Sequence, residues 1–350
     1  MSDTMTLEQI KAGGDIILNR DSSFDIAEYG DGGVVGGVSS RGRQAWHGLL
    51  EVRAKELLTI DDVREAYAPL FLPIHKEPLN HWGRPVPGKF AIVRSDGKVL
   101  GIVGRRYHEY AFEKVAEFGQ TILDTGEANI ETAVSTNNEA SFFLVMKLSR
   151  ELKIAGLEHE MLDLYLLLSN SLDGSSKFRA AITPVRVECT NSENFALKHA
   201  PRMYEIVHTS SIEGRVLDAR AALGISYAYV DAVADIGTKL LGQKMRGSDF
   251  SAFLNRLVPL PPLPEGKDST RVRTNRENVR SMIRFLYAED DHTANIRGTR
   301  WAALQAVTKY HDHHQGRRKT ETSSADESRF NAIVEPNADN LPNRALALLV

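Results

Sequence analysis

The stretch MLDLYLLLSNSLDGSSKFRAAITPVRVEC, residues 161–189, decides the fold. Residues 162–169 are almost wholly apolar, and they end in a polar segment, 170–175, of the residue types that favour turns. Residues 178–189 follow and are rich in β-branched side chains. Two apolar runs of strand length around a turn predict an antiparallel pair of strands.

Two further strand pairs precede this one. Residues 90–94 and 99–103 are apolar around a Ser-Asp-Gly-Lys turn, and residues 130–135 and 141–148 are separated by a polar segment. Because hairpins dominate, we expect one largely antiparallel sheet of at least five or six strands, with helices covering one face. A helical C-terminal region follows it, so the predicted class is α+β.

Helices are predicted before, between and after these strands. Thr59 with Asp62 has the spacing of a capping box, which predicts a helix start at residue 60. Apolar residues recur at helical spacing over 112–123 and over 212–241, and a shorter helix is expected over 248–257. Residues 75–88 carry Pro, Asn, His and Gly and are expected to form a loop.

The composition is that of a soluble globular protein, with 42% hydrophobic and 25% charged residues among 350. No apolar run approaches the ~20 residues of a membrane helix, and residues 1–15 do not resemble a secretory signal. The single cysteine, Cys189, excludes an internal disulfide and is expected to be a buried, inert thiol. We therefore expect a cytoplasmic protein without membrane contact.

Composition divides the chain into five parts. Residues 1–40 are expected to form a flexible arm, because their glycine-rich segment lacks the Lys-Ser/Thr that completes a phosphate-binding loop. The α+β core is expected over 41–258, and a proline-rich linker over 259–269. A basic helical region is expected over 270–316. It is followed by a disordered tail, 317–350, with an apolar C-terminus.

The basic helical region points to nucleic acid. Four of its arginines recur every three or four residues and would form one ridge on a helix, with Glu277 as the only acid inside the run. A net charge of −3 allows one basic groove on an acidic body. Trp46, Trp301 and His108 are candidates for stacking on bases. The alternative is that these arginines face solvent or pair with acids. The candidate nucleic-acid-binding residues are Arg105, Arg106, Tyr107, Arg273, Arg276, Arg280, Arg284, Arg297 and Arg300.

Other chemistry is less well supported. His311, His313 and His314 form a histidine-rich segment, but cysteine partners and an evident fourth ligand are missing. Histidines that end a helix also interact favourably with its dipole. There is no Gly-x-Ser-x-Gly motif of a hydrolase. We assign no catalytic residue, no metal and no cofactor.

Several motifs in a fixed order carry a resemblance. They are Ala45–Trp46–His47–Gly48, the segment GIVGRRY at 101–107, Asp173–Gly174–Ser175, TPVRVECTN at 183–191, His208–Thr209 and GTRWAALQAVTKY at 298–310. Together they resemble a family of phage and plasmid proteins whose domain is labelled as of unknown function. The resemblance implies a phage, prophage or plasmid origin, and it supplies no activity and no catalytic residues.

The order of elements from residue 89 onwards is also similar to the core of single-strand annealing recombinases. Those proteins form oligomeric rings or filaments and hold DNA in a basic groove without nucleotide hydrolysis. This similarity is one of element order.

Three hypotheses follow. The first is a phage- or plasmid-derived protein that binds DNA, single-stranded by preference, and assists annealing or recombination as a homo-oligomer in the host cytoplasm, without nucleotide hydrolysis. The second is a non-enzymatic structural or host-interaction protein whose arm and tail dock on partners. The third is a metal-dependent nuclease, which needs convergent carboxylates that a sequence alone does not reveal.

Overall fold

A computed structural model describes most of the chain. The described residues are 59–150, 152–154, 161–186, 195–196, 201–205, 212–262, 267–317, 324–334 and 339–350, with four short strands at 16–18, 24–26, 36–39 and 51–52. Trp46, Cys189, His208 and residues 263–266 of the expected linker lie outside this set, so the expectations for them stay predictions. None of the described helices is both long and apolar enough to span a bilayer.

The main sheet has eight strands in the described part of the chain. Their order is β13 (Met203–Glu205), β12 (Arg179–Arg186), β11 (Met161–Ser171), β9 (Ser141–Leu148), β8 (Ala128–Thr136), β3 (Gly36–Ser39) and β4 (Glu51–Val52), and β10 (Leu152–Lys153) also pairs with β11. Only the short β3–β4 pair is parallel. The prediction of an α+β protein with a largely antiparallel sheet is confirmed.

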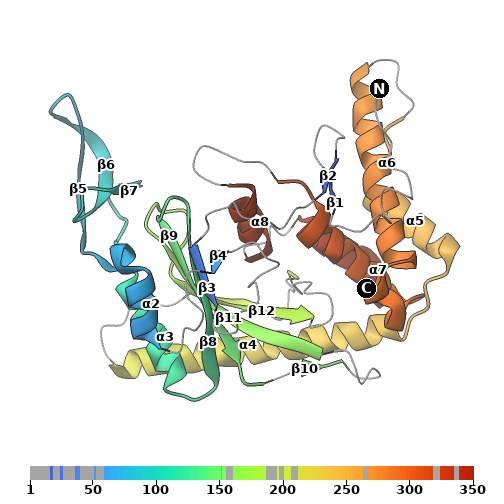
Figure 1. The fold of residues 1–350 in the computed structure, drawn as a ribbon, viewed down its shortest axis with the longest axis horizontal. Coiled ribbons are helices and arrows are strands. Elements are labelled where there is room, and N and C mark those ends of the chain that lie inside the picture. Colours follow the sequence, from blue (N-terminus) through green and yellow to red (C-terminus); the bar gives the residue numbers. More distant parts are fainter. Residues whose placement is uncertain are drawn as a thin grey trace.

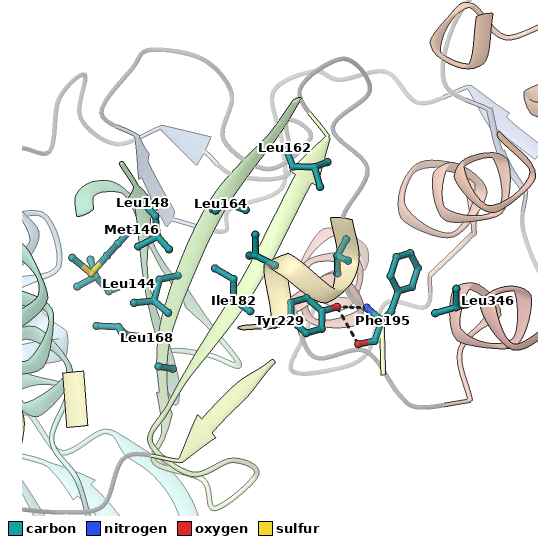
Figure 2. Packing of buried hydrophobic residues seen from close by; sticks show 14 of the residues in the cluster. Leu144, Met146, Leu148, Leu162, Leu164, Leu168, Ile182, Phe195, Tyr229 and Leu346 are labelled. Atoms are coloured by element: carbon teal, nitrogen blue, oxygen red, sulfur yellow. Dashed lines mark hydrogen bonds between the residues drawn. The ribbon is translucent and has the colours of Figure 1, made fainter. Parts of the chain in front are cut away.

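Helices cover the first face of this sheet. The leucines at 162, 164, 166 and 168 of β11 point to one side, as the two-residue period of a strand requires, and all four are buried. Figure 2 shows Leu162, Leu164 and Leu168 in one apolar layer with Leu144 and Met146 of β9 and Ile182 of β12. The 30-residue α4 (Ile212–Leu241) runs along this side of the sheet, and α3 (Glu113–Leu123) packs near its end (Figure 1).

The second face is covered as well, which the sequence did not predict. Val145 of β9 and Leu167 of β11 form a separate buried cluster with Phe330 and Val334 of α8 (Ala325–Val334). The rings of Phe143 and Phe330 meet edge to face, with centroids 5.1 Å apart. The expectation of a disordered tail over 317–350 is therefore wrong for this segment. The segment is polar in overall composition, but one face of the short helix α8 is apolar.

A second sheet projects from the body (Figure 1). It consists of β5 (Ile74–His81), β6 (Arg84–Arg94) and β7 (Val99–Gly104), all antiparallel; we call it the arm. The β6–β7 hairpin was predicted, but as part of the main sheet. The predicted loop at 75–88 is instead the β5–β6 hairpin. Its turn has positive φ at Trp82 (52°) and Gly83 (75°), a combination that suits the twist of a two-residue hairpin turn.

The prolines explain why this hairpin was missed. Pro78 lies on β5, which among the described strands pairs with β6 alone, and Pro85 lies where β6 extends beyond its pairing with β7. Proline is tolerated at such edges, because its missing N–H interrupts no second ladder. A register shift beside Pro78 absorbs the remaining irregularity.

The C-terminal region is helical and shares its core with the main sheet. It contains α5 (Gly247–Leu257), α6 (Lys267–Ala288), a 3₁₀ segment η2 (Asp291–Ile296), α7 (Arg300–Lys309), a π-helical turn η3 (Tyr310–His314) and α9 (Leu341–Leu349). Helix α7 is buried over most of its surface, and α9 packs against α5 and α7. The apolar C-terminus thus docks on the chain's own core. This removes one motive for the host-interaction hypothesis.

The N-terminal part also differs from expectation. Residues 36–39 belong to the N-terminal segment 1–40 that was expected to be flexible, but they form β3 and pair with β8. In the same segment, β1 (Ile16–Leu18) pairs with β2 (Phe24–Ile26). Strand β8 would otherwise have an unpaired edge, which explains the demand for a partner. Helix α2 (Ile60–Ala66) begins as predicted, with Thr59 and Asp62 forming the capping box, and the 3₁₀ segment η1 (Ala68–Phe71) follows.

The arm approaches the main sheet at a glycine, which generates a test. A Cβ placed on Gly101 of β7 would lie 2.3 Å from the Cα of Asp173, whereas one on Gly104 of the same strand meets nothing within 4 Å. We expect Gly101→Ala to lower the free energy of unfolding by about 1–3 kcal/mol through overpacking. Gly104→Ala should stay within about 0.5 kcal/mol of wild type. Urea denaturation of both variants measures this, and equal midpoints would contradict the close approach.

Candidate nucleic-acid interface

The predicted arginine ridge lies on α6, but three of its members bind the protein's own backbone. Arg273 Nη1 donates to the carbonyl of Pro261 (2.9 Å), and Arg276 Nη1 donates to that of Pro259. Arg280 is buried, and its Nε donates to the carbonyl of Val258 at 2.7 Å. These carbonyls belong to the segment that leaves α5.

This arrangement has a clear physical reason. The last carbonyls of an α-helix have no partner within the helix and carry the negative end of its dipole. The segment after α5 is rich in proline, which has no N–H to offer in return. Guanidinium groups supply the missing donors. The expectation of an exposed, mostly unpaired ridge is therefore wrong for Arg273, Arg276 and Arg280, and Arg273 also pairs with Glu277 at 3.0 Å. Arg284 is exposed, as expected.

Arginines bind the last carbonyl of three helices in the same way. Arg344 donates to Leu257, the last residue of α5, at 2.5 Å, and Arg300 donates to Leu349, the last residue of α9, at 2.7 Å. Arg202 donates to Val334, the last residue of α8, and burial lowers the pKa of its guanidinium to about 10. Arg300, a predicted binding residue, thus has a structural role. Arg297 is exposed and donates to the carbonyl of Asp290 (3.0 Å).

The second predicted group, Arg105, Arg106 and Tyr107, lies where the arm joins the main sheet. We call this junction, formed by segment 101–107 and the turn at 173–175, the root. Both arginines are exposed in the turn after β7. The Tyr107 hydroxyl donates to the carbonyl of Ser171 at 2.7 Å, and burial, with smaller effects of Asp173 and Glu109, raises its pKa to about 12. The Tyr107 ring is therefore a fixed wall of the root rather than a freely offered stacking surface.

The root joins two of the motifs quoted above. Segment 101–107 packs on the turn at 173–175, where Asp173 Oδ1 accepts a hydrogen bond from the Ser175 backbone N–H at 2.8 Å. The two segments are brought together by the close approach of Gly101 and by the Tyr107 hydrogen bond. Lys76 of β5 also binds this segment, because its Nζ donates a hydrogen bond to the carbonyl of Arg105 at 2.9 Å.

An ion cluster fixes the arm to the β8–β9 turn. Arg94 of β6 is 4% exposed and pairs with Asp96 (2.7 Å) and with Glu139 (2.8 Å), which also pairs with Lys98 (2.8 Å). The hydrogen bond from Arg94 holds the pKa of Asp96 at about 2. The turn reaches this position through positive φ angles of 52°, 53° and 71° at three consecutive residues, 137–139.

The arm is basic and carries an exposed aromatic side chain, which the sequence analysis missed. Residues 74–108 contain seven lysines and arginines against two carboxylates, a charge of +5 on a chain of net charge −3. Trp82 at the hairpin tip is 91% exposed, and Arg84 and Lys89 are exposed on β6. The signal that could have found the tip is Trp82–Gly83 flanked by prolines, which marks a tight turn. Of the predicted stacking residues, His108 is exposed, but Trp301 is completely buried in α7.

The histidine-rich segment is buried in η3 and does not point outward. His311 Nδ1 lies 2.9 Å from Asp312 Oδ1, and its Nε2 lies 3.1 Å from Arg317 Nη2. The rings of His313 and His314 are 6.4 Å apart between centroids. Among the described residues, no three His, Cys, Asp or Glu side chains converge into a group of metal-binding size.

The arginines of α6 provide a matched pair of variants. We expect Arg280→Ala to lower the free energy of unfolding by about 1–3 kcal/mol, because it leaves a buried carbonyl without a donor. Arg284→Ala, exposed on the same helix, should change it by at most about 0.5 kcal/mol. Chemical denaturation followed by circular dichroism compares the two. Equal stability, combined with a loss of DNA binding in Arg280→Ala alone, would restore the ridge as a binding surface.

Comparison with known proteins gives one match. A family model described as "Domain of unknown function (DUF932)" matches residues 99–334, about two thirds of the chain. No curated protein and no solved structure matches this chain. The matched region begins with β7, ends with α8, and so includes the arm's root and both faces of the main sheet. The chain therefore belongs to the DUF932 family.

Proposed function

We propose that this protein binds single-stranded DNA and that the projecting arm is the binding surface. The observation that carries the proposal is the concentration of positive charge on the arm and the residues directly after it, +5 over residues 74–108, on a chain that is otherwise acidic. Phosphate contacts from lysine and arginine supply most of the sequence-independent affinity for nucleic acid. An acidic body and a basic arm together orient a polyanion toward the arm.

The aromatic tip favours single strands over duplex. Trp82 is almost fully exposed at the hairpin tip, and its ring meets that of His81 edge to face, with centroids 6.0 Å apart. An exposed indole offers a stacking surface to an unpaired base, and the bases of a duplex are already stacked on each other. Arg84 follows in the same turn and is exposed, so a phosphate next to the stacked base has a cationic partner.

The root of the arm gives this surface a fixed position. The Arg94–Glu139 pair, the Tyr107–Ser171 hydrogen bond and the close approach at Gly101 all connect the arm to the main sheet. Binding to a preorganised surface costs less conformational entropy than binding to a mobile loop. Arg105 and Arg106 lie exposed beside this root and extend the basic surface toward the body.

The biological setting belongs to the proposal as well. The resemblance to phage and plasmid proteins and the element order shared with annealing recombinases support a phage- or plasmid-encoded accessory of annealing or recombination. It would act without nucleotide hydrolysis, as a homo-oligomer in the host cytoplasm. Light scattering with and without single-stranded DNA tests the assembly.

The stacking role of Trp82 has a direct test. We expect Trp82→Ala to weaken binding of a labelled single-stranded oligonucleotide by roughly 5- to 150-fold, because stacking of one base contributes about 1–3 kcal/mol. Trp82→Phe should retain most of the affinity. Fluorescence anisotropy at fixed salt measures both. Wild-type affinity in Trp82→Ala would contradict a role for the tip, and no binding by the wild-type protein at low salt would end the proposal.

The salt dependence of DNA affinity tests the role of the two arginines at the root. We expect the double variant Arg105→Ala, Arg106→Ala to reduce the slope of log affinity against log salt by about 0.7 for each phosphate that the protein no longer neutralises. Arg284→Ala is the control, an exposed arginine on α6 away from the arm. If Arg284→Ala reduces the slope and the double variant does not, the groove lies along α6 instead.

A further inference from the structure

A cavity of about 560 Å³ lies away from the arm, in the C-terminal helical region. Its walls come from the end of α5, from α6, from η3 and the residues after it, and from the start of α9; α5, α6 and α7 mark this part of the molecule in Figure 1. The volume falls in the range of small-molecule sites, roughly 300–1,000 Å³. The cavity plays no part in the proposed DNA interface.

Three arginines from three different elements line this cavity: Arg276 of α6, Arg317 after η3 and Arg344 of α9. Asp339 is the carboxylate among its lining residues. The formal charge of the wall is therefore +2. In the described part of the chain, no carboxylate oxygen forms an ion pair, at 4.0 Å or less, with the guanidinium of Arg276 or Arg344. The charge of these two groups is thus not neutralised by a described carboxylate.

Each of these two guanidinium groups is held by one backbone bond. Arg276 donates through Nη1 to Pro259, and Arg344 donates through Nη2 to Leu257. A guanidinium has five N–H donors in a rigid fork. One backbone bond therefore orients each group and leaves other donors for an oxyanion. The carbonyls of Pro259 and Leu257 belong to the same short segment, so both arginines are anchored to one stretch of the cavity wall.

His311 is held in a defined tautomer at the wall. A guanidinium can only donate, so Arg317 Nη2, 3.1 Å away, makes Nε2 of His311 the acceptor. The ring proton then lies on Nδ1, which donates to Asp312 Oδ1 at 2.9 Å. His311 thereby positions Arg317, whose Nη2 also donates to the His311 carbonyl at 3.2 Å.

We propose that this cavity binds a phosphate monoester. A phosphate monoester carries a charge of about −1.5 to −2 at neutral pH and three strong acceptor oxygens, which matches the +2 wall and its fixed donors. Arginine forks suit phosphate geometry better than a point charge does. The space beyond one phosphate is bordered by Asn275, Asn340 and apolar side chains such as Val279, so an organic group attached to the phosphate has room.

The test uses the full chain and calorimetric titration with five probes: inorganic phosphate, deoxyadenosine monophosphate, deoxyadenosine, and a short oligonucleotide in two forms, one with a 5′-phosphate and one with a 5′-hydroxyl. We expect the monophosphate to bind and deoxyadenosine not to bind. Binding of both inorganic phosphate and the mononucleotide assigns the site to a free phosphate compound. A preference for the 5′-phosphorylated over the 5′-hydroxyl oligonucleotide assigns it to a strand end.

Two variants localise the site. We expect Arg276→Ala to weaken phosphate binding roughly tenfold or more, because it removes a charge-assisted hydrogen bond. Gln315→Glu, which adds a carboxylate to the wall without removing any described bond, should weaken it by a similar factor. This second variant keeps the test valid if Arg276→Ala lowers stability. Arg284→Ala is the matched control on α6 and should bind normally.

The outcomes separate this site from the arm. Trp82→Ala should leave phosphate binding unchanged, and Gln315→Glu should leave the salt dependence of single-strand binding unchanged. Absence of binding by all phosphate probes overturns the proposal. Wild-type affinity in both folded variants, Arg276→Ala and Gln315→Glu, also overturns it.

Discussion

The structure depends on the burial of β11 from every side. Its backbone pairs with β9 and β10 on one edge and with β12 on the other, and each of its faces contributes to a buried apolar cluster. An antiparallel sheet often leaves one face in water, but this one has buried side chains on both. Two separate coverings are therefore needed. Helix α4 provides one directly after the sheet, and α8 provides the other from far along the chain.

Arginines fix the return of the C-terminal region onto the sheet. The last carbonyls of α5, α8 and α9 accept hydrogen bonds from Arg344, Arg202 and Arg300, none of which belongs to the helix that it caps. A helix end that is removed from water needs such a donor. The positive charge also meets the negative end of the helix dipole. Much of the basic character of this region therefore serves the fold, and Arg344 both caps α5 and lines the cavity.

The sequence predicted the parts of this fold that local patterns specify. The β8–β9 and β6–β7 hairpins, α4 and the Thr59 cap follow from alternation, helical periodicity and capping chemistry. The β5–β6 hairpin was missed because its prolines argue against strands, and only its edge position makes them acceptable. The role of Arg280 could not be predicted, because its partner Val258 is 22 residues away and a regular arginine spacing looks the same whether it faces phosphate or carbonyl. The binding role of Arg105 and Arg106 stays a prediction. Trp82 was not among the predicted candidates, because the hairpin that exposes it was not predicted.

The late position of α8 has a consequence for synthesis of the chain. About 120 residues separate the end of β13 from the start of α8, the helix that covers the second face of the sheet. At roughly 5–20 residues per second, a ribosome needs on the order of ten seconds to make them. During that interval the strands can already pair, while Phe143, Val145 and Leu167 remain uncovered. The nascent chain thus presents an apolar sheet face to the cell before its own helix arrives, and this face is a natural binding site for chaperones.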